Sequence, residues 1–391
     1  MKKISVGILL LSLLFSCTSY DEDVSGLSSD YSLTGSKSGG SSANGEGNPI
    51  EPGKITSGEW NDLNNWVFMD SLLNSQDYSK MPTYWKLFTN HRVSVKVVDS
   101  ELKPAVDQQI TLKYNGKNVW IAKTNNEGKA ELWVDVFQKS ETIDLAKLQI
   151  EVGAKTITGV KTFESGINTI ILTSNVSKPN NVELAFVVDA TGSMGDELEY
   201  LKTELKDVIS RAKTNNPNVS MLTGSVFYRD EEDDYVTRIS NFSSDINTTL
   251  DFIKKQSASG GGDFPEAVHT ALDKAINNLQ WSSSARTRII FLLLDAPPHY
   301  ETKIISEIQS HLQTASEKGI MIIPITASGI DKETEFLMRF MSVITNGTYV
   351  FITNDSGIGS EHLKPTVGKY EVEFLNNLML RLINKYSMIP Q

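Results

Sequence analysis

The chain has 391 residues, of which 39% are hydrophobic and 22% charged, so its composition excludes a collagen-like or wholly disordered protein. This length predicts two or three domains and is enough for a sizeable core. The formal net charge of −11 excludes nucleic-acid binding through the overall electrostatic field.

The first sixteen residues have the pattern of a secretory signal peptide. Lys2 and Lys3 precede an apolar run that is too short to span a membrane. The run ends at Cys17, the only cysteine in the chain, and the sequence LFSC that ends there resembles the lipobox of bacterial lipoproteins. The resemblance implies that residues 1–16 are removed and that Cys17 is lipidated, which anchors the chain to a membrane. An ordinary secretory signal, lost together with its cysteine, is the alternative.

Three acidic residues after this cysteine, Asp21, Glu22 and Asp23, resemble the export tags that send some lipoproteins to the outer face of the outer membrane. That resemblance implies a lipid-anchored protein of the outer membrane, exposed on the cell surface. A solvated tether accounts for the same acidic residues equally well.

Residues 17–55 are rich in Ser, Gly, Asn and acidic residues, a composition that predicts a flexible tether because it cannot bury a core. The sequence TSGE that begins at Thr56 then fits a capping box, and apolar residues follow at helical spacing from Trp60. These features predict a short helix within a separate segment, residues 56–90.

From His91 the hydrophobic period changes to two, which predicts about seven short β-strands, the number expected of a small sandwich. Asn115-Gly116 suits a hairpin turn between two of them. The stretches VKVVDSELKPAVDQQITLKYNG and AKTNNEGKAEL resemble the carboxypeptidase regulatory-like family, whose fold is immunoglobulin-like and which occurs in exported bacterial proteins. The resemblance implies an antiparallel β-sandwich over residues 91–176 that acts as a spacer or docking unit.

Nearly continuous apolar segments alternate with helical patterns in the rest of the chain. This alternation predicts a doubly wound, Rossmann-like α/β domain over residues 181–391, with a mostly parallel sheet. The expected strands have the sequences VELAFVV, NVSMLTGSVF, TRIIFLLL and GIMIIPIT. The expected helices cover residues 196–213, 245–256, 265–279, 302–318, 331–343 and 370–385. The chain is therefore predicted to be multidomain, with a small antiparallel β-sandwich followed by this α/β domain.

Three loops of the α/β domain carry oxygen-bearing side chains at the carboxyl ends of predicted strands, where doubly wound sheets bind their ligands. The first loop has Asp189, Thr191 and Ser193, the second has Asp263 after three glycines, and the third has Asp295. Carboxylates that converge at such an edge repel one another, and a cation relieves the repulsion. Because all these candidate ligands are oxygens, they predict Mg²⁺, Mn²⁺ or Ca²⁺ rather than zinc. Such an ion would keep an exchangeable position that a partner's carboxylate could take.

The motifs DATGSM, GGGDFPEAV and FLLLDAPPH resemble the metal-ion-dependent adhesion site (MIDAS) of the von Willebrand factor type A family. The resemblance to this family extends over the whole predicted α/β domain. The resemblance implies that Thr191 and Ser193 are direct ligands and that Asp189 binds the ion directly or through water. It also implies that Asp295 is the acid of the third loop. Adhesion receptors of the family have a threonine where this chain has Asp263, which resembles instead a subgroup that includes alpha-kinase-linked members. The extra negative charge weakens the ion's attraction for a partner's carboxylate.

Other roles are open for several of these residues. Thr191 would suit a turn, Ser193 a helix N-cap, and Asp263 a cap for the helix that follows it. His299, on the third loop, is either the base of a metal-assisted hydrolase or a packing residue at the rim. The acidic run RDEEDD at residues 229–234 is either a solvated loop or a second cation site.

Together these features predict a lipid-anchored, cell-surface protein whose type A domain binds a divalent cation and mediates protein–protein interaction or adhesion. The chain is predicted not to be an enzyme. Two alternatives are open. In one, the ion only ties the loops together within a structural component of a surface complex. The other, with less support, is the metal-assisted hydrolase.

Overall fold

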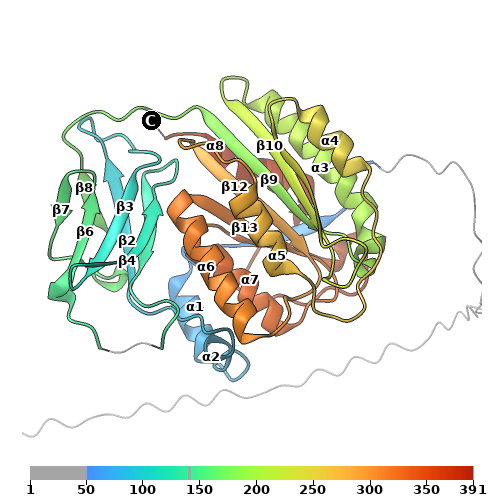
Figure 1. Cartoon of the computed structure of the whole chain (residues 1–391), viewed down its shortest axis with the longest axis horizontal. Coiled ribbons are helices and arrows are strands. Elements are labelled where there is room, and N and C mark those ends of the chain that lie inside the picture. The colour runs from blue at the N-terminus through green and yellow to red at the C-terminus, as the bar shows by residue number, and fades with distance from the viewer. Residues whose placement is uncertain (1–50, 140–141, 391) are drawn as a thin grey trace, which may run out of the picture. The chain divides into compact units, whose positions relative to one another are not determined.

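An eight-stranded mixed sheet is the largest sheet of the structure, a computed structural model that describes residues 51–139 and 142–390 (Figure 1). Its strands are β1 (Thr56–Trp60), β9 (Asn181–Asp189), β10 (Ser220–Tyr228), β11 (Thr237–Ser243), β12 (Thr287–Leu294), β13 (Ile320–Thr326), β14 (Tyr349–Ile352) and β15 (Glu373–Phe374). They lie in the order β11-β10-β9-β12-β13-β14-β1-β15. The strands from β10 to β14 in this order run parallel to one another. At the two edges, β11, β1 and β15 pair antiparallel with their neighbours.

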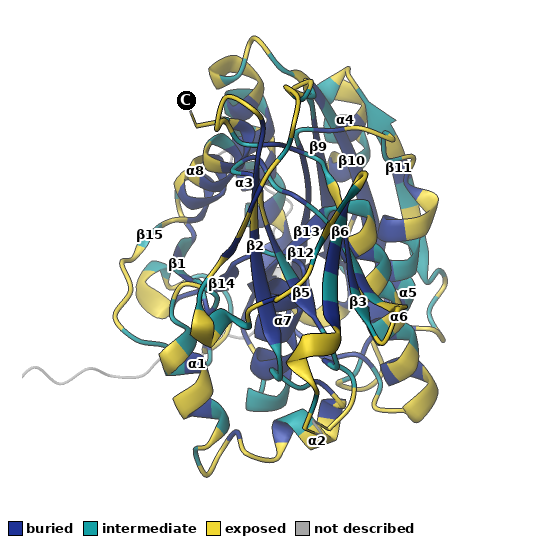
Figure 2. Ribbon diagram, turned by 90° about the vertical axis from the view of Figure 1, so that its left-hand side faces the viewer, coloured by how far each residue is buried: buried dark blue, intermediate teal, exposed yellow. Residues whose placement is uncertain are grey.

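Helices cover both faces of this sheet, and they are α3 (Gly195–Asn215), α4 (Ile246–Lys254), α5 (Val268–Asp273), α6 (Thr302–Lys318), α7 (Lys332–Ile344) and α8 (Leu375–Ser387). Side chains of α3, α4 and α8 pack in one core cluster with strand residues such as Leu184 and Phe186. Those of α5, α6 and α7 pack in a second cluster with the intervening residues Ala185 and Val187. Strands β9, β12 and β13 are buried along almost their whole length, as strands covered on both faces must be (Figure 2). The prediction of a doubly wound α/β domain is therefore confirmed.

The predicted helices and strands of this domain agree closely with the observed elements. Helix α6 has the predicted bounds, whereas α5 begins only at Val268 and continues as a π-helical turn, Lys274–Asn278. Strands β11 and β14 have no counterpart among the predicted ones. Edge strand β11 lacks a continuous apolar run, and β14 has only four residues, so neither produces a strong local pattern.

The helix predicted from Thr56 is wrong, because Thr56–Trp60 form strand β1, which pairs with both β14 and β15. A capping-box pattern is a local signal, and hydrogen bonds to two neighbouring strands outweigh it. Gly58 lies so close to the ring of Phe351 in β14 that a Cβ atom there would come within 2.6 Å of it. Residues 56–90 therefore belong to the sheet at their start and include the two short helices α1 (Trp66–Leu73) and α2 (Met81–Trp85).

The predicted tether is packed at its C-terminal end. Ile55 is fully buried, and the backbone N–H groups of Gly53 and Lys54 donate to the Glu204 carboxylate on α3 at 2.9 Å. The tether therefore ends before residue 53 rather than at residue 55. The predicted signal peptide and the lipidation site Cys17 lie outside the described residues. No helix of the described part is both long enough and apolar enough to cross a membrane.

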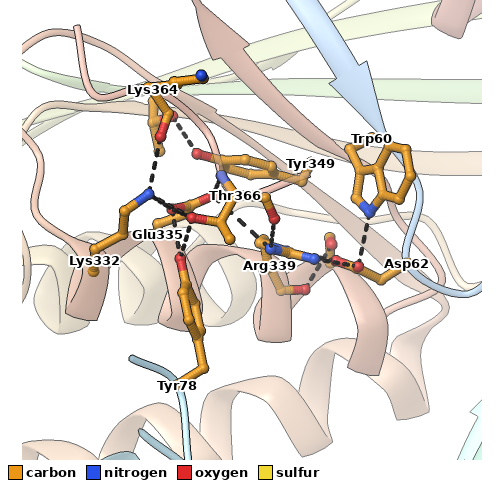
Figure 3. A network of polar contacts seen from close by, with 11 residues as sticks. Trp60, Asp62, Tyr78, Lys332, Glu335, Arg339, Tyr349, Lys364 and Thr366 are labelled. Atoms are coloured by element: carbon orange, nitrogen blue, oxygen red, sulfur yellow. Dashed lines mark hydrogen bonds and ion pairs between the residues drawn. The ribbon is translucent and has the colours of Figure 1, made fainter. Parts of the chain in front are cut away.

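A buried polar network fastens the segment after β1 to helix α7 (Figure 3). Arg339 on α7 donates two hydrogen bonds to the Asp62 carboxylate, with Nη2···Oδ1 2.6 Å and Nε···Oδ2 2.9 Å. The indole of Trp60 donates to the same carboxylate at 2.9 Å. One turn earlier on α7, Glu335 accepts a hydrogen bond of 2.6 Å from the Tyr78 hydroxyl. Because Arg339 and Asp62 are both buried, their charges depend on each other for compensation, whereas Glu335 also pairs with Lys332 at 2.8 Å.

Two smaller sheets are formed by β2 (Arg92–Val98), β3 (Gln109–Tyr114), β4 (Lys117–Lys123), β5 (Lys129–Trp133), β6 (Leu148–Val152), β7 (Lys155–Ile157) and β8 (Asn168–Ile171). Their strand orders are β5-β2-β8 and β4-β3-β6-β7. Buried side chains of the two sheets, such as Val95 and Leu112, belong to one core cluster. Strands β2 and β8 pair in parallel, so the prediction of a wholly antiparallel arrangement is wrong for this pair. The carboxypeptidase regulatory-like assignment of this region stays a prediction.

Replacing Arg339 with alanine should lower the free energy of unfolding by about 3–5 kcal/mol, because the Asp62 carboxylate would stay buried without its cationic partner. Urea denaturation followed by circular dichroism measures this loss. Arg211→Ala is the matched control, since that side chain is 42% exposed and pairs with Asp207 on its own helix. The control should lose less than about 1 kcal/mol. Equal losses in the two variants would contradict the importance of the buried network.

Candidate metal centre

Asp189 and Asp295 meet at the carboxyl edge of the large sheet. Asp189 is the last residue of β9, and Asp295 directly follows β12. These strands are adjacent and parallel, with Val188 opposite Leu293, so their ends bring the two carboxylates together. Both side chains are buried, with 0% of Asp189 and 5% of Asp295 exposed. The structure thus places the acids of the first and third predicted loops side by side.

Thr191 and Ser193 lie in the turn between β9 and α3. The backbone N–H and the hydroxyl of Thr191 both donate to Oδ1 of Asp189, at 2.9 and 2.7 Å. The same hydroxyl lies 3.2 Å from that of Ser193. Neither hydroxyl caps the short 3₁₀ turn Gly192–Met194 or helix α3, so the N-cap role is not observed. Thr191 is buried and Ser193 is exposed, which leaves one side of the group open to solvent.

Glu266 is a third buried carboxylate at this centre and is absent from the predicted ligands. A Cβ atom on Gly261 would lie 2.7 Å from Oε1 of Glu266 and 3.1 Å from Cβ of Thr191, so both side chains lie against this glycine. The N–H of Glu266 donates to the carbonyl of Pro297 at 2.8 Å, which ties the second loop to the third. Its place in the motif GGGDFPEAV, as an acid just before an apolar helix, is the sequence signal that points to it.

Asp263 belongs to a different group of side chains. It is exposed, and its carboxylate gathers with Asp230 and His299, one ligand atom of each lying within 4.8 Å of the others. In the described part of the chain, no hydrogen bond joins Asp263 to Asp189, and Asp263 does not cap α5. Its role as a ligand of the ion at Asp189 stays a prediction, and Glu266 is the better placed acid of the second loop.

Burial raises the pKa of all three carboxyl groups at the centre. For Asp189, desolvation outweighs the hydrogen bonds from Thr191, so the pKa lies above its ordinary value. Burial and the charge of Asp189 raise the pKa of Asp295 as well. Burial, with the charges of Asp189 and Asp230, raises the pKa of Glu266 to about 9. Each of the three groups also has a buried oxygen without a hydrogen-bond partner among the described residues, namely Asp189 Oδ2, Asp295 Oδ1 and Glu266 Oε2.

Neighbouring side chains do not compensate these oxygens. The hydroxyl of Tyr228 lies close to Asp189 but makes no hydrogen bond of ordinary geometry. Arg229 directs its guanidinium to the carbonyl groups of Ala190 and Ser257 instead. Unpartnered carboxylate oxygens in a buried site are unfavourable unless positive charge is supplied. A divalent cation that prefers oxygen ligands, such as Mg²⁺, Ca²⁺ or Mn²⁺, fits this set of donors.

Comparison with known proteins identifies the type of domain that carries this centre. Residues 183–357 match the family model of the von Willebrand factor A domain, which confirms this part of the prediction. A putative ariadne-like RING finger protein of Acanthamoeba polyphaga mimivirus is 29% identical over 201 residues, which are 47% of this chain and 20% of that protein. An alpha-protein kinase of Dictyostelium discoideum is 31% identical over 120 residues, which are 30% of this chain and 19% of the kinase. The chain thus spans about a fifth of the length of these curated relatives.

Two solved structures of Bacteroides proteins are also similar. One is an aerotolerance-related membrane protein from Bacteroides fragilis with multiple mutations to serines, with a TM-score of 0.34 and 14% identity, covering 53% of this chain and 98% of that one. The other is the conserved hypothetical protein BatB from Bacteroides thetaiotaomicron, with a TM-score of 0.35 and 16% identity, covering 53% of this chain and 97% of that one.

The stability of the metal-free protein should fall as the pH rises from about 4 to about 9. Over this range the folded protein binds more protons than the unfolded chain, because the three carboxyl groups have raised pKa values only when folded. The Tm in EDTA, measured by calorimetry, should therefore be lower at about pH 8 than at about pH 5, and Mg²⁺ should restore it mainly at the higher pH. The double variant Asp189→Asn/Asp295→Asn should show a smaller fall. A wild-type Tm that responds to neither pH nor Mg²⁺ would contradict this account.

Proposed function

We propose that the von Willebrand factor A domain of this chain binds a divalent cation at Asp189 and Asp295 and uses the ion as a docking point for a protein partner. The observation that carries the proposal is the set of three buried carboxylate oxygens, on Asp189, Asp295 and Glu266, for which the described part of the chain offers no hydrogen-bond partner. Mg²⁺, Mn²⁺ or Ca²⁺ would satisfy them directly or through water. The hydroxyls of Thr191 and Ser193 would contribute neutral ligands. In this proposal Glu266 is the ligand from the second loop, a role that the sequence predicts for Asp263.

The surroundings of the centre define the kind of partner. The exposed Ser193 and the exposed glycines at 260–262 leave the ion accessible to an oxygen ligand from a partner, such as a carboxylate. The neighbouring cavity is strongly acidic, with Glu231, Glu232 and Asp233 in its lining. Because these charges repel a surface that is acidic throughout, we expect a partner that presents one oxygen ligand within a basic surface.

A loop-tying ion without a partner is the second candidate. It is favoured by the burial of Asp189 and Asp295, since an ion held by these two carboxylates stabilises the three loops whether or not anything docks there. The two candidates share the ion and differ only in what the ion does.

The proposed role is not catalytic. His299, the candidate base of a hydrolase, is hydrogen-bonded to Asp230 at 2.8 Å. Within the residues that the structure describes, no hydrogen bond joins His299 to Ser193, the exposed hydroxyl at the centre. A nucleophile that is activated by a base needs such a contact. The geometry therefore favours binding over hydrolysis.

The proposed location is the outer-membrane surface, with a lipid anchor on Cys17. This part of the proposal is supported by the sequence alone, through LFSC and the acidic residues that follow it. A surface location would expose the type A domain to partners outside the cell. Labelling of the protein on intact cells by a membrane-impermeant reagent would test it.

Mg²⁺ should bind to the purified protein in isothermal titration calorimetry, and Asp189→Ala and Asp295→Ala should each abolish binding, because each removes a charged ligand. Affinity capture from cells that carry the protein should then retain a partner with wild type in Mg²⁺ and lose it in EDTA. Asp251→Ala is the matched control, since it removes one exposed acidic charge from α4 and should change neither result.

Each outcome of these two measurements has a separate meaning. If the partner is still captured in EDTA, the ion is not the docking point. Tight Mg²⁺ binding without any partner that depends on it would leave the loop-tying role. Failure to bind any divalent cation would exclude both candidates.

A further inference from the structure

A second group of metal-binding side chains, Asp230, Asp263 and His299, lies outside the centre formed by Asp189 and Asp295. Each offers one ligand atom, and these atoms lie within 4.8 Å of one another. The imidazole Nε2 of His299 is 2.8 Å from Oδ1 of Asp230. Ligands of one transition-metal ion are at most about 4 Å apart, because each bond is about 2.0–2.2 Å long. A small inward movement of the exposed Asp263 would therefore complete the set.

Three loops supply these side chains, and the fold holds the loops together. Asp230 follows β10, Asp263 precedes α5, and His299 lies between β12 and α6. The carboxylate of Asp233 accepts hydrogen bonds from the N–H of Asp230 at 3.1 Å and from the N–H of Gly261 at 2.9 Å. These bonds join the loop of Asp230 to the loop of Asp263. The side chain of Asp233 thus positions two of the three ligand loops relative to each other.

The group opens into a cavity of about 720 Å³ with a large excess of negative charge. Its acidic lining residues are Asp230, Glu231, Glu232, Asp233, Asp263 and Glu301. Among the described residues that line it, Lys303 is the only lysine or arginine. Arg229 precedes Asp230 in the chain but is engaged with two backbone carbonyls. Besides Lys303, His269 and His299, which also line the cavity, solvent ions or a bound cation would have to compensate this charge.

Glu266, which also belongs to the first centre, is a buried carboxylate next to this cavity. It is 2% exposed, and its Oε2 has no hydrogen-bond partner. Its Oε1 lies against Gly261, which lines the cavity. The N–H of the same Gly261 donates to Asp233 at 2.9 Å, so the Glu266 carboxylate lies between the first centre and the second group.

We propose that Asp230, Asp263 and His299 bind a second divalent cation, distinct from the one at Asp189 and Asp295. The imidazole nitrogen distinguishes the two sites. An all-oxygen set favours Mg²⁺ or Ca²⁺, whereas two carboxylates and an imidazole favour Zn²⁺, with water completing the coordination. A plain ion pair between His299 and Asp230 is the arrangement that requires no metal, and it predicts none of the results below.

The test is a Zn²⁺ titration of the full chain, purified without a histidine tag and kept in excess Mg²⁺. Calorimetry, and metal analysis after gel filtration, should show one Zn²⁺ per chain. His299→Gln and Asp263→Asn should each weaken Zn²⁺ binding at least about tenfold, because each removes one ligand. Asp189→Asn should still bind one Zn²⁺, even though it loses Mg²⁺ at the first centre.

His91→Gln is the matched control. His91 also pairs with a carboxylate, Asp135, at 3.0 Å, but it belongs to no described group of three ligands, so this variant should bind Zn²⁺ like wild type. Wild type that takes up no Zn²⁺ in excess Mg²⁺ would overturn the proposal. Asp263 is exposed, so Asp263→Asn should stay folded, and wild-type affinity in this variant would also overturn it. Zn²⁺ binding without Mg²⁺ binding would refute the first centre alone.

Discussion

The convergence of buried carboxylates where β9 and β12 end is the constraint on which the rest of the α/β domain depends. Asp189 and Asp295 are placed there because two parallel strands end side by side, and Glu266 joins them from the loop before α5. Their charges repel one another in a site from which water is largely excluded. Positive charge at this point would compensate these groups and stabilise the three loops around them. In the proposed function, a bound divalent cation supplies that charge.

The loop of three glycines, residues 260–262, lies between the centre at Asp189 and the second group of metal-binding side chains, and it leaves room for both. Gly260 and Gly261 both have positive φ, +81° and +73°. A Cβ atom on Gly260 would lie 2.0 Å from the carboxylate of Asp233, and one on Gly261 would lie 2.7 Å from Glu266. Only glycine adopts this backbone readily and leaves room on both sides. The loop thus brings an all-oxygen centre close to a group that includes the imidazole of His299.

A strand of the large sheet comes from a part of the chain that the family model does not match, since β1 precedes residues 183–357. Strand β1 pairs between β14 and β15, and the network of Asp62, Arg339 and Glu335 continues this attachment into α7. Residues that precede the two small sheets therefore contribute to the core of the domain that follows them. A β-strand forms its backbone hydrogen bonds with neighbouring strands, and these strands can be far from it in the sequence.

By itself, the sequence determined the α/β class and the pairing of Asp189 with Asp295, because continuous apolar runs and helical periods reflect burial that repeats along an element. Acids at the ends of two such runs are then adjacent whenever the strands are. Only the tertiary structure decided that Thr56–Trp60 is a strand and that Glu266, rather than Asp263, lies beside Thr191. Strand β1 forms because β14, far away in the sequence, lies next to it. Glu266 is placed by the bend at Gly261 and by its hydrogen bond to the carbonyl of Pro297, which depend on how the loops fold together.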